Sequence, residues 1–362
     1  MMKRTYNFGA GPAMLPESIL KEAQEELLNW QNLGMSVLEI GHRTEEFKAL
    51  LKHAEQTLCE LLNIPTNYRV LFLGGAARTQ FAMIPLNLVG NKPAGYIVTG
   101  IWSKLALQEA QHLKQAYCIA STEENKYLTI PVQNDLAIQD NSAYIYYTPN
   151  ETINGVRFPY VPKVKGLPLI ADMTSCLLSE PIDIRQYDLI FAGAQKNIAN
   201  AGLTVVIIRE ELLEQGLQNA IPTMLDYRVH LDNHSLYATP PVFNCYIAAK
   251  MFDWVKAQGG VDALFAENCR KAAKLYQYLD QANDFYTTSV MPEARSIMNV
   301  CFSLKNTKLE GIFLEKAKHH GLSALKGHRM VGGLRASLYN AMPMSGVDAL
   351  VHFMQEFAEE YS

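Results

Sequence analysis

Lys196 is the residue of this chain whose surroundings most favour covalent chemistry. Apolar runs of strand length lie on both sides of it, at residues 188–191 and 203–208. The turn between these runs holds small residues: Gly193, Ala194, Ala199, Ala201 and Gly202. A lysine amine where two buried strands end, with room for a flat and large molecule, has the setting that a Schiff-base lysine needs. The alternative is an ordinary solvated loop lysine, since most lysines are exposed.

Two further residues follow strand-like segments and suit a flat heteroaromatic ligand. Asp172 ends an apolar run, at the edge of the sheet where α/β proteins bind ligands, and its carboxylate could hold a protonated ring nitrogen. Trp102 comes just after another strand end, and its indole suits stacking on a ring. Taken singly, Asp172 is equally well explained as a helix N-cap and Trp102 as a core residue.

Three segments carry features that bind anions. Residues 74–80, Gly-Gly-Ala-Ala-Arg-Thr-Gln, follow a strand and open a helix, so that small residues and unpaired backbone N–H groups could cradle a phosphate. A tight turn that needs small residues explains the same segment. Gly-His-Arg occurs twice, at residues 41–43 and 327–329, and Arg335 follows the second copy. Arginine grips carboxylates and phosphates bidentately, so the pattern indicates a multiply charged anionic substrate or, alternatively, solvated basic turns.

The hydrophobic pattern predicts the elements that position these residues. Strands are expected at residues 69–73, 95–99, 143–147, 167–171, 188–191, 203–208 and 298–304. Helices are expected at residues 16–31, 44–62, 103–114 and 309–320, through 85–88 and from Ser345 onward. Strands that alternate with helices favour an α/β fold with a mostly parallel sheet. We expect a large domain at residues 16–261 and a small α+β domain at residues 262–362, which also includes residues 1–15.

The bulk properties exclude several classes of protein. The 362 residues are 49% hydrophobic and 19% charged, with a net charge of −4 and no basic stripe, so no nucleic-acid partner is expected. We expect neither a signal peptide nor a membrane span, because no apolar run is long enough. The six cysteines are scattered and predict reduced thiols in a cytoplasmic protein. The nine histidines lack metal-ligand spacing, so no metal is expected.

Several motifs, in order along nearly the whole chain, carry a family resemblance. They are residues 7–16 (Asn-Phe-Gly-Ala-Gly-Pro-Ala-Met-Leu-Pro), 41–43, 149–153 (Pro-Asn-Glu-Thr-Ile), 193–197 (Gly-Ala-Gln-Lys-Asn), 239–241 (Thr-Pro-Pro) and 326–343. With these motifs the chain resembles the phosphoserine aminotransferase family of class V. Members have fold type I and use pyridoxal 5′-phosphate.

The resemblance implies a cofactor role for individual residues. Lys196 would bind pyridoxal phosphate as an imine and act in catalysis with Asp172, which would hold the ring nitrogen. Trp102 would stack on the ring, and Thr152 would donate to the phenolic oxygen. The other implied cofactor contacts are Ala77, Arg78, Thr174, Gln195 and, from a second subunit, Thr239. One position departs from the family pattern, because Ala238 stands where an asparagine is expected as a phosphate ligand.

The resemblance also implies the substrates. Arg335 would clamp the α-carboxylate. The distal phosphate or carboxylate would be held by His328 and Arg329, and by His42 and Arg43 of the neighbouring subunit. The expected reaction moves the amino group of L-glutamate to 3-phosphohydroxypyruvate, giving 2-oxoglutarate and O-phospho-L-serine in serine biosynthesis. A homodimer with shared active sites is expected, and 4-phosphohydroxythreonine of pyridoxine biosynthesis is a second possible substrate.

Two groups of alternatives remain beside this interpretation. Within class V, an alanine–glyoxylate or serine–pyruvate type aminotransferase has no need for two Gly-His-Arg segments. A cysteine desulfurase needs a reactive cysteine in a cationic loop, which the six cysteines do not offer. From another class, a non-catalytic anion- or nucleotide-binding module could use residues 74–80, but it would leave Lys196 and Asp172 without a purpose.

Overall fold

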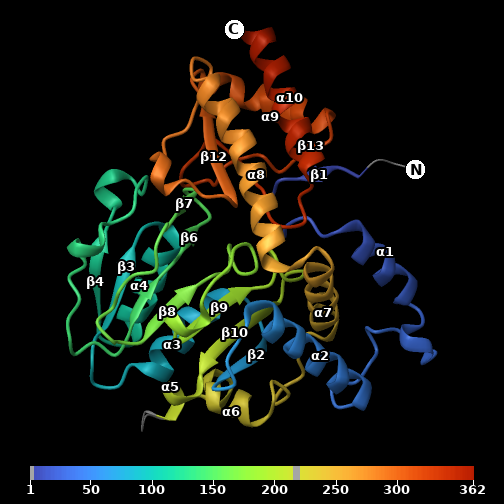
Figure 1. The fold of residues 1–362 in the computed structure, drawn as a ribbon, viewed down its shortest axis with the longest axis vertical. Coiled ribbons are helices and arrows are strands. Elements are labelled where there is room, and N and C mark those ends of the chain that lie inside the picture. Colours follow the sequence, from blue (N-terminus) through green and yellow to red (C-terminus); the bar gives the residue numbers. More distant parts are fainter. Residues whose placement is uncertain (1–3, 215–220) are drawn as a thin grey trace.

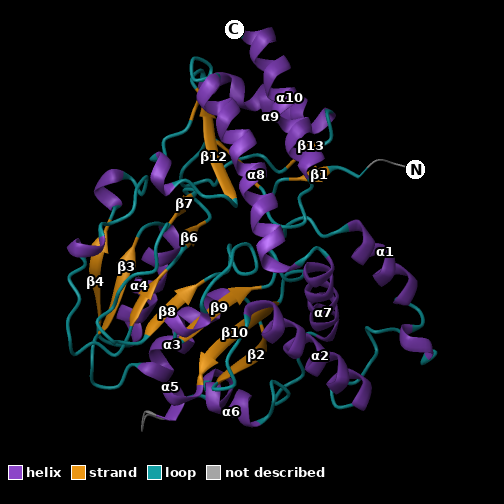
Figure 2. Ribbon diagram, viewed as in Figure 1, coloured by secondary structure: helices purple, strands orange, loops and turns teal. Residues whose placement is uncertain are grey.

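The computed structural model describes residues 4–214 and 221–362. Its centre is a seven-stranded sheet in which β10 runs antiparallel to both neighbours and every other neighbouring pair is parallel (Figure 2). The strands, in spatial order, are β2 (Tyr68–Gly74), β10 (Leu203–Arg209), β9 (Leu189–Gly193), β8 (Leu169–Asp172), β5 (Ile145–Tyr147), β3 (Ala94–Val98) and β4 (Ala116–Ser121). The predicted α/β class with a mostly parallel sheet is confirmed.

Helices cover both faces of this sheet because successive strand side chains point to opposite sides. Along β2, Val70 and Phe72 join one buried cluster, which also contains residues of α2 (Glu45–Leu62) and α7 (Val242–Ala257). The intervening Leu71 and Leu73 join a second cluster with residues of α3 (Gln80–Leu88) and α4 (Ile101–Leu113). With both faces buried, the edge formed by the strand ends is where a ligand can enter.

Helix α2 shows how closely local sequence signals set an element. Its N-cap is Thr44, whose hydroxyl accepts a hydrogen bond from the Phe47 backbone N–H at 3.3 Å. Glu45 and Glu46 lie in the first turn, where carboxylates stabilise the positive end of the helix. The helix ends at Asn63, whose φ of 49° is left-handed. The helix predicted at residues 44–62 is therefore confirmed.

The C-terminal part forms its own layer above the large sheet (Figure 1). Its three-stranded antiparallel sheet has the order β11 (Tyr286–Thr287), β12 (Asn299–Leu304), β14 (Leu334–Ser337). The helices α8 (Gly260–Gln281), α9 (Glu310–His319) and α10 (Met344–Tyr361) pack with it around a third buried cluster. The N-terminal β1 (Tyr6–Asn7) pairs with β13 (Leu322–Ser323), so this strand lies with the C-terminal part. The domain bounds stay a prediction.

Some elements differ from the sequence prediction. The first helix, α1 (Glu17–Glu26), stops short of residue 31, and a 3₁₀ turn follows in which Gln31 has a φ of 50°. The sequence analysis did not predict β4 or α7. The α-helices and strands not yet described are β6 (Asn150–Glu151), β7 (Val156–Arg157), α5 (Glu210–Glu214) and α6 (Tyr227–Asp232).

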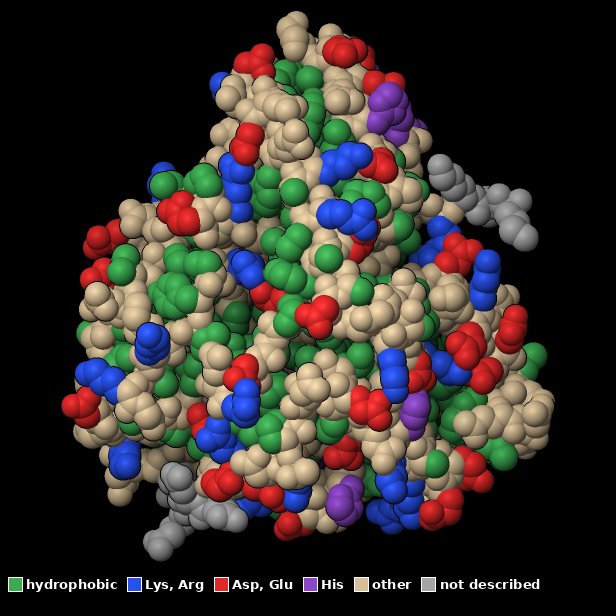
Figure 3. Space-filling model, viewed as in Figure 1, with side chains coloured by type: hydrophobic (Ala, Val, Ile, Leu, Met, Phe, Trp, Pro, Cys, Tyr) green, Lys and Arg blue, Asp and Glu red, His purple; other side chains and the backbone are tan. Residues whose placement is uncertain are grey.

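On the face in Figure 3, side chains of both charges are interspersed. Among the described residues, no helix is both long and apolar enough to cross a bilayer.

Candidate active site

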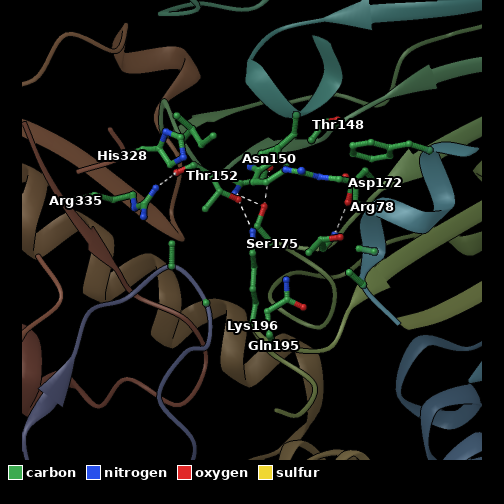
Figure 4. Close-up of a pocket in the computed structure, with 18 residues that line it drawn as sticks. Arg78, Thr148, Asn150, Thr152, Asp172, Ser175, Gln195, Lys196, His328 and Arg335 are labelled. Carbon is green, nitrogen blue, oxygen red and sulfur yellow. Dashed lines mark hydrogen bonds between the residues drawn. The ribbon is translucent and has the colours of Figure 1, made fainter. Parts of the chain in front are cut away.

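A cavity of about 480 Å³ lies at the carboxyl ends of the central strands, beneath the C-terminal part (Figure 4). Parallel strands and the loops that follow them meet at this edge, so residues far apart in the sequence come together. The cavity is lined by ten of the residues predicted to act in the site: Ala77, Arg78, Trp102, Thr152, Asp172, Thr174, Gln195, Lys196, His328 and Arg335.

Lys196 lies in the turn between β9 and β10, and its side chain is only 8% exposed. The solvated-lysine alternative is therefore wrong. Its Nζ donates a hydrogen bond to the Thr152 hydroxyl at 2.5 Å (Figure 4). Burial lowers the pKa of Lys196 to about 8, an effect that Asp172 opposes and Arg335 adds to. An amine with this pKa is partly neutral near physiological pH and can act as a nucleophile or a base.

Asp172 is the last residue of β8 and is 6% exposed. Its Oδ1 accepts a hydrogen bond from the Thr174 backbone N–H at 3.0 Å, which fixes the carboxylate at the strand end. Burial raises the pKa of this carboxyl, and the Thr174 hydrogen bonds and the charge of Lys196 act in the opposite direction. A carboxylate in this place can stabilise a positive charge on a ligand.

Trp102 lies in the first turn of α4 and lines the cavity. The Arg78 guanidinium stands over the indole, 5.2 Å from the ring centroid, so one face of the ring already contacts a planar cation. The indole Nε1 is buried and has no hydrogen-bond partner among the described residues. The ring also packs against the second buried cluster, so the core interpretation and the stacking interpretation are compatible.

The segment that follows β2 places backbone N–H groups at the cavity wall. Gly75 has a φ of 120°, which favours glycine, and the chain then forms a short 3₁₀ turn (Ala77–Thr79) before α3. Ala77 and Arg78 line the cavity at this turn. Close packing extends to Gly193, where an added Cβ would lie 3.0 Å from the Ala77 Cβ and 2.6 Å from the Gln195 side-chain oxygen. The segment is a tight turn and also presents donors that suit a phosphate.

Arg335 and His328 enter the cavity from the C-terminal part. Arg335 belongs to β14 and donates through Nη1 to the Thr152 carbonyl oxygen at 3.4 Å, while its Nε is buried without a partner among the described residues. Burial, followed by the charges of Arg335 and Arg329, lowers the pKa of His328. Because Arg335 makes only the one weak contact with Thr152, most of its guanidinium N–H groups are available to a carboxylate.

Four predicted residues do not line this cavity: His42, Arg43, Arg329 and Thr239. Thr239 lies beside Ala238 at a separate hollow of about 290 Å³, which shares Ala76 with the main cavity. Arg43, Arg329 and Thr239 are exposed. Three of the four, all but Arg329, were predicted to act from a second subunit, and the roles of all four stay predictions.

The sequence analysis missed several polar residues around the cavity. Thr148, Asn150 and Ser175 line it, and the Asn150 side-chain amide donates to the Ser175 hydroxyl at 2.8 Å. Asn150 and the buried Glu151 belong to the motif at residues 149–153, in which only Thr152 was given a role. Their place in this motif was therefore the sequence signal that could have identified Asn150 and Glu151.

The residues present fit pyridoxal phosphate. The cavity combines a buried amine, a carboxylate that can face a ring nitrogen, an indole for stacking, and backbone donors for a phosphate. The buried donors without partners, Trp102 Nε1 and Arg335 Nε, indicate that the walls are shaped to receive polar atoms.

Comparisons with known proteins agree with this geometry. The family model described as aminotransferase class-V matches residues 5–350. The phosphoserine aminotransferase of Legionella pneumophila subsp. pneumophila is 68% identical over 361 residues, which cover 99% of each chain. The solved phosphoserine aminotransferase of Bacillus circulans subsp. alkalophilus is similar with a TM-score of 0.97 and 42% identity, covering 100% of both chains. A solved PLP-bound phosphoserine aminotransferase from Trichomonas vaginalis has a TM-score of 0.94 and 40% identity, covering 97% of this chain and 100% of that one.

Proposed function

The chain belongs to the class-V aminotransferase family, and on that premise we propose that it is a phosphoserine aminotransferase of serine biosynthesis. It has fold type I and transfers the amino group of L-glutamate to 3-phosphohydroxypyruvate, which gives 2-oxoglutarate and O-phospho-L-serine. The observation that carries this proposal is the buried amine of Lys196, which shares one cavity with Asp172 and Arg335.

Pyridoxal phosphate is the cofactor that this cavity suits. Lys196 would hold it covalently, Asp172 would face its ring nitrogen, Trp102 would stack on the ring and Thr152 would contact the phenolic oxygen. The phosphate would be held by Ala77, Arg78, Thr174, Gln195 and the partner's Thr239. When bound, the cofactor supplies an electron sink for the negative charge that develops at the substrate Cα.

The proton transfers are carried by Lys196. Its Nζ is the base that takes the proton from the substrate Cα, and it later returns a proton as the acid. A pKa of about 8 suits both tasks near neutral pH, because efficient general acid–base groups titrate near the working pH. The Thr152 hydroxyl, at 2.5 Å, holds the amine in the cavity between these steps.

Dual specificity follows from the placement of cationic groups. L-Glutamate and O-phospho-L-serine both carry an α-carboxylate, which Arg335 would clamp, and a second anionic group at the far end. That distal anion would be held by His328 and Arg329, with His42 and Arg43 of a second copy. Arginine forks accept either a carboxylate or a phosphate, so one site serves both substrates.

A homodimer with shared active sites is part of this proposal. His42, Arg43 and Thr239 do not line the cavity of their own chain, as expected for residues that serve a neighbour. The segment before His42 also exposes large apolar side chains: Leu27, Leu28, Leu33, Met35 and Leu38. Leu28 is 84% exposed, which is costly unless a second copy covers this face. The proposed location is the cytoplasm, where the scattered thiols would stay reduced.

The test is an assay of the purified protein loaded with pyridoxal phosphate. L-Glutamate and 3-phosphohydroxypyruvate should yield 2-oxoglutarate and O-phospho-L-serine, with much lower turnover for glyoxylate or pyruvate as the acceptor. A preference for glyoxylate or pyruvate would overturn the assignment in favour of another class V aminotransferase. The same assay, run in reverse with 4-phosphohydroxythreonine and 2-oxoglutarate, tests whether 4-phosphohydroxythreonine is also a substrate.

A further inference from the structure

Glu151 is a buried carboxylate to which the proposed mechanism gives no role. Its side chain is 0% exposed, although it lies at the end of β6 beside the cavity. Oε1 accepts hydrogen bonds from the Ser103 backbone N–H at 2.8 Å and the Ser103 hydroxyl at 2.6 Å, and Oε2 accepts from the Trp102 backbone N–H at 3.1 Å. Glu151 therefore caps the first turn of α4 from a distant part of the sequence.

Glycine at position 100 makes this cap possible. Gly100 is the N-cap of α4, and it has no side chain that could do the capping. Its φ of −178° is extended, so its backbone conformation does not require glycine. Space does require it, because a Cβ at position 100 would overlap the Glu151 carboxyl group. The sequence thus leaves the helix terminus open for the distant carboxylate.

The hydrogen bonds around Glu151 favour its ionised form. The Ser103 hydroxyl accepts from the backbone N–H groups of Thr99 at 3.0 Å and Gly100 at 3.1 Å, so its own proton points either at Glu151 or at the Gly100 carbonyl oxygen, 3.2 Å away. The backbone N–H groups of Trp102 and Ser103 donate to the carboxylate in either case. Burial raises the pKa of Glu151 to about 7, and the Ser103 and Trp102 hydrogen bonds oppose this. The positive end of α4 stabilises the charge.

The position of Glu151 connects two sides of the cavity. One side is Trp102, whose backbone Glu151 binds directly. The other side is Thr152, the next residue in the chain, whose hydroxyl accepts from Lys196 (Figure 4). Because one residue joins both, the first turn of α4 cannot shift without moving the loop that carries Thr152.

We infer that Glu151 is a positioning residue that fixes the indole of Trp102 relative to Thr152 and Lys196, and so sets the slot for the cofactor ring. This inference rests on the proposed function. Glu151 does not line the cavity, so its effect would pass through the ring contacts of the cofactor. A residue of this kind tunes cofactor affinity and the rate of the chemical step rather than substrate binding.

The test compares three variants of the full-length protein. Glu151→Gln keeps the size but removes the charge and one acceptor oxygen. Ser103→Ala leaves the charge of Glu151 in place and removes the hydroxyl, which donates to Glu151 and accepts from the backbone N–H groups of Thr99 and Gly100. Asp226→Asn is the matched control, because Asp226 caps α6 by accepting from the Arg228 backbone N–H at 2.9 Å and does not line the cavity. The measurements are the dissociation constant of pyridoxal phosphate, the visible absorbance of the loaded protein, kcat and KM for L-glutamate, and thermal unfolding.

Glu151→Gln should weaken pyridoxal phosphate binding about tenfold, shift the visible band and lower kcat while KM for L-glutamate stays near wild type. Ser103→Ala should weaken binding about threefold, and it carries the test if Glu151→Gln does not fold. Asp226→Asn should lower thermal stability alone. The inference is overturned if Glu151→Gln lowers thermal stability but leaves the affinity for pyridoxal phosphate and the visible absorbance unchanged. The same result for Ser103→Ala overturns it where Glu151→Gln does not fold. Equal weakening of pyridoxal phosphate binding by the control Asp226→Asn also overturns it. Failure of the wild-type protein to bind pyridoxal phosphate would instead overturn the proposed function.

Discussion

Two lysines of the described residues are buried, and they differ in what surrounds the amine. Lys196 is 8% exposed and lines the cavity, and Lys271 is 0% exposed in α8. Burial lowers both pKa values, to about 8 and about 7. Lys196 donates to one hydroxyl, whereas Lys271 donates to the backbone carbonyls of Leu338 at 3.1 Å, Tyr339 at 2.9 Å and Met342 at 3.0 Å. A lowered pKa therefore does not identify a reactive lysine; spare bonding capacity and access to a cavity do.

The structural lysine supports the reactive one. Lys271 holds the segment that follows β14, and within that segment the Asn340 backbone N–H donates to the Asn197 side-chain oxygen at 3.1 Å. Asn197 follows Lys196, and its side-chain amide donates to the Leu177 carbonyl at 3.1 Å. The turn that carries Lys196 is thus tied both to the segment after β14 and to the segment after β8.

The largest effect is expected for Lys196→Ala. Without the amine, transamination should fall about 10²–10⁴-fold or more, since the general acid–base group and the covalent anchor are both lost. The visible absorbance of the lysine-bound cofactor should disappear, while urea unfolding of the cofactor-free protein should show no loss of stability. A retained imine band would assign the covalent role to another lysine, and the contrast between Lys196 and Lys271 would no longer hold.

Lys271→Met should have the opposite profile. Three buried carbonyls lose their donor, so we expect about 3 kcal/mol of destabilisation in urea unfolding, with a normal absorbance in the protein that remains folded. Lys274→Met is the matched control, because Lys274 lies on the same helix with a side chain that is 46% exposed, and surface changes cost little. Equal destabilisation of the two variants would show that the three carbonyl contacts of Lys271 contribute nothing.

The contrast between the two lysines also shows what the sequence can predict. Lys196 is recognisable because it stands between two apolar runs in a turn of small residues, and Asp172 and Trp102 are recognisable as residues that follow strands. Lys271 gives no such signal, since a charged residue in an amphipathic helix normally faces solvent. Glu151 is missed for a related reason. Its partners, Trp102 and Ser103, are 49 and 48 residues away, and only the folded chain brings them together.

Substrate recognition should depend on the cationic residues proposed to hold the distal anion at the Lys196 site, and on none near Lys271. Arg43→Ala and Arg329→Ala should each reduce kcat/KM for O-phospho-L-serine about tenfold to hundredfold, because a charge-assisted contact to the distal phosphate is lost. L-Alanine has no distal anion and should lose much less. Steady-state assays with both amino acids measure the ratio. An equal loss for both would remove these arginines from the distal-anion site.

The smallest and sharpest effect concerns the pH dependence of lysine modification in the cofactor-free protein. The neutral amine is the reactive form, so the modification rate of a lysine rises as the pH passes upward through its pKa. For Lys196 the rise should centre near pH 8, well below the ordinary value of 10.5. Lys271, whose pKa burial lowers to about 7, should still remain unmodified at pH 8, because it is 0% exposed and its amine donates to three carbonyls.

Reductive methylation followed by peptide mass spectrometry measures both lysines in one sample. Exposed lysines such as Lys274 provide the internal reference. If Lys271 reacts as fast as Lys196 at pH 8, then the pKa rather than access controls reactivity, and the distinction between the two sites fails. If only Lys196 reacts, its reactivity follows from a buried amine with a single hydrogen-bond partner that faces an open cavity, a combination that Lys271 lacks.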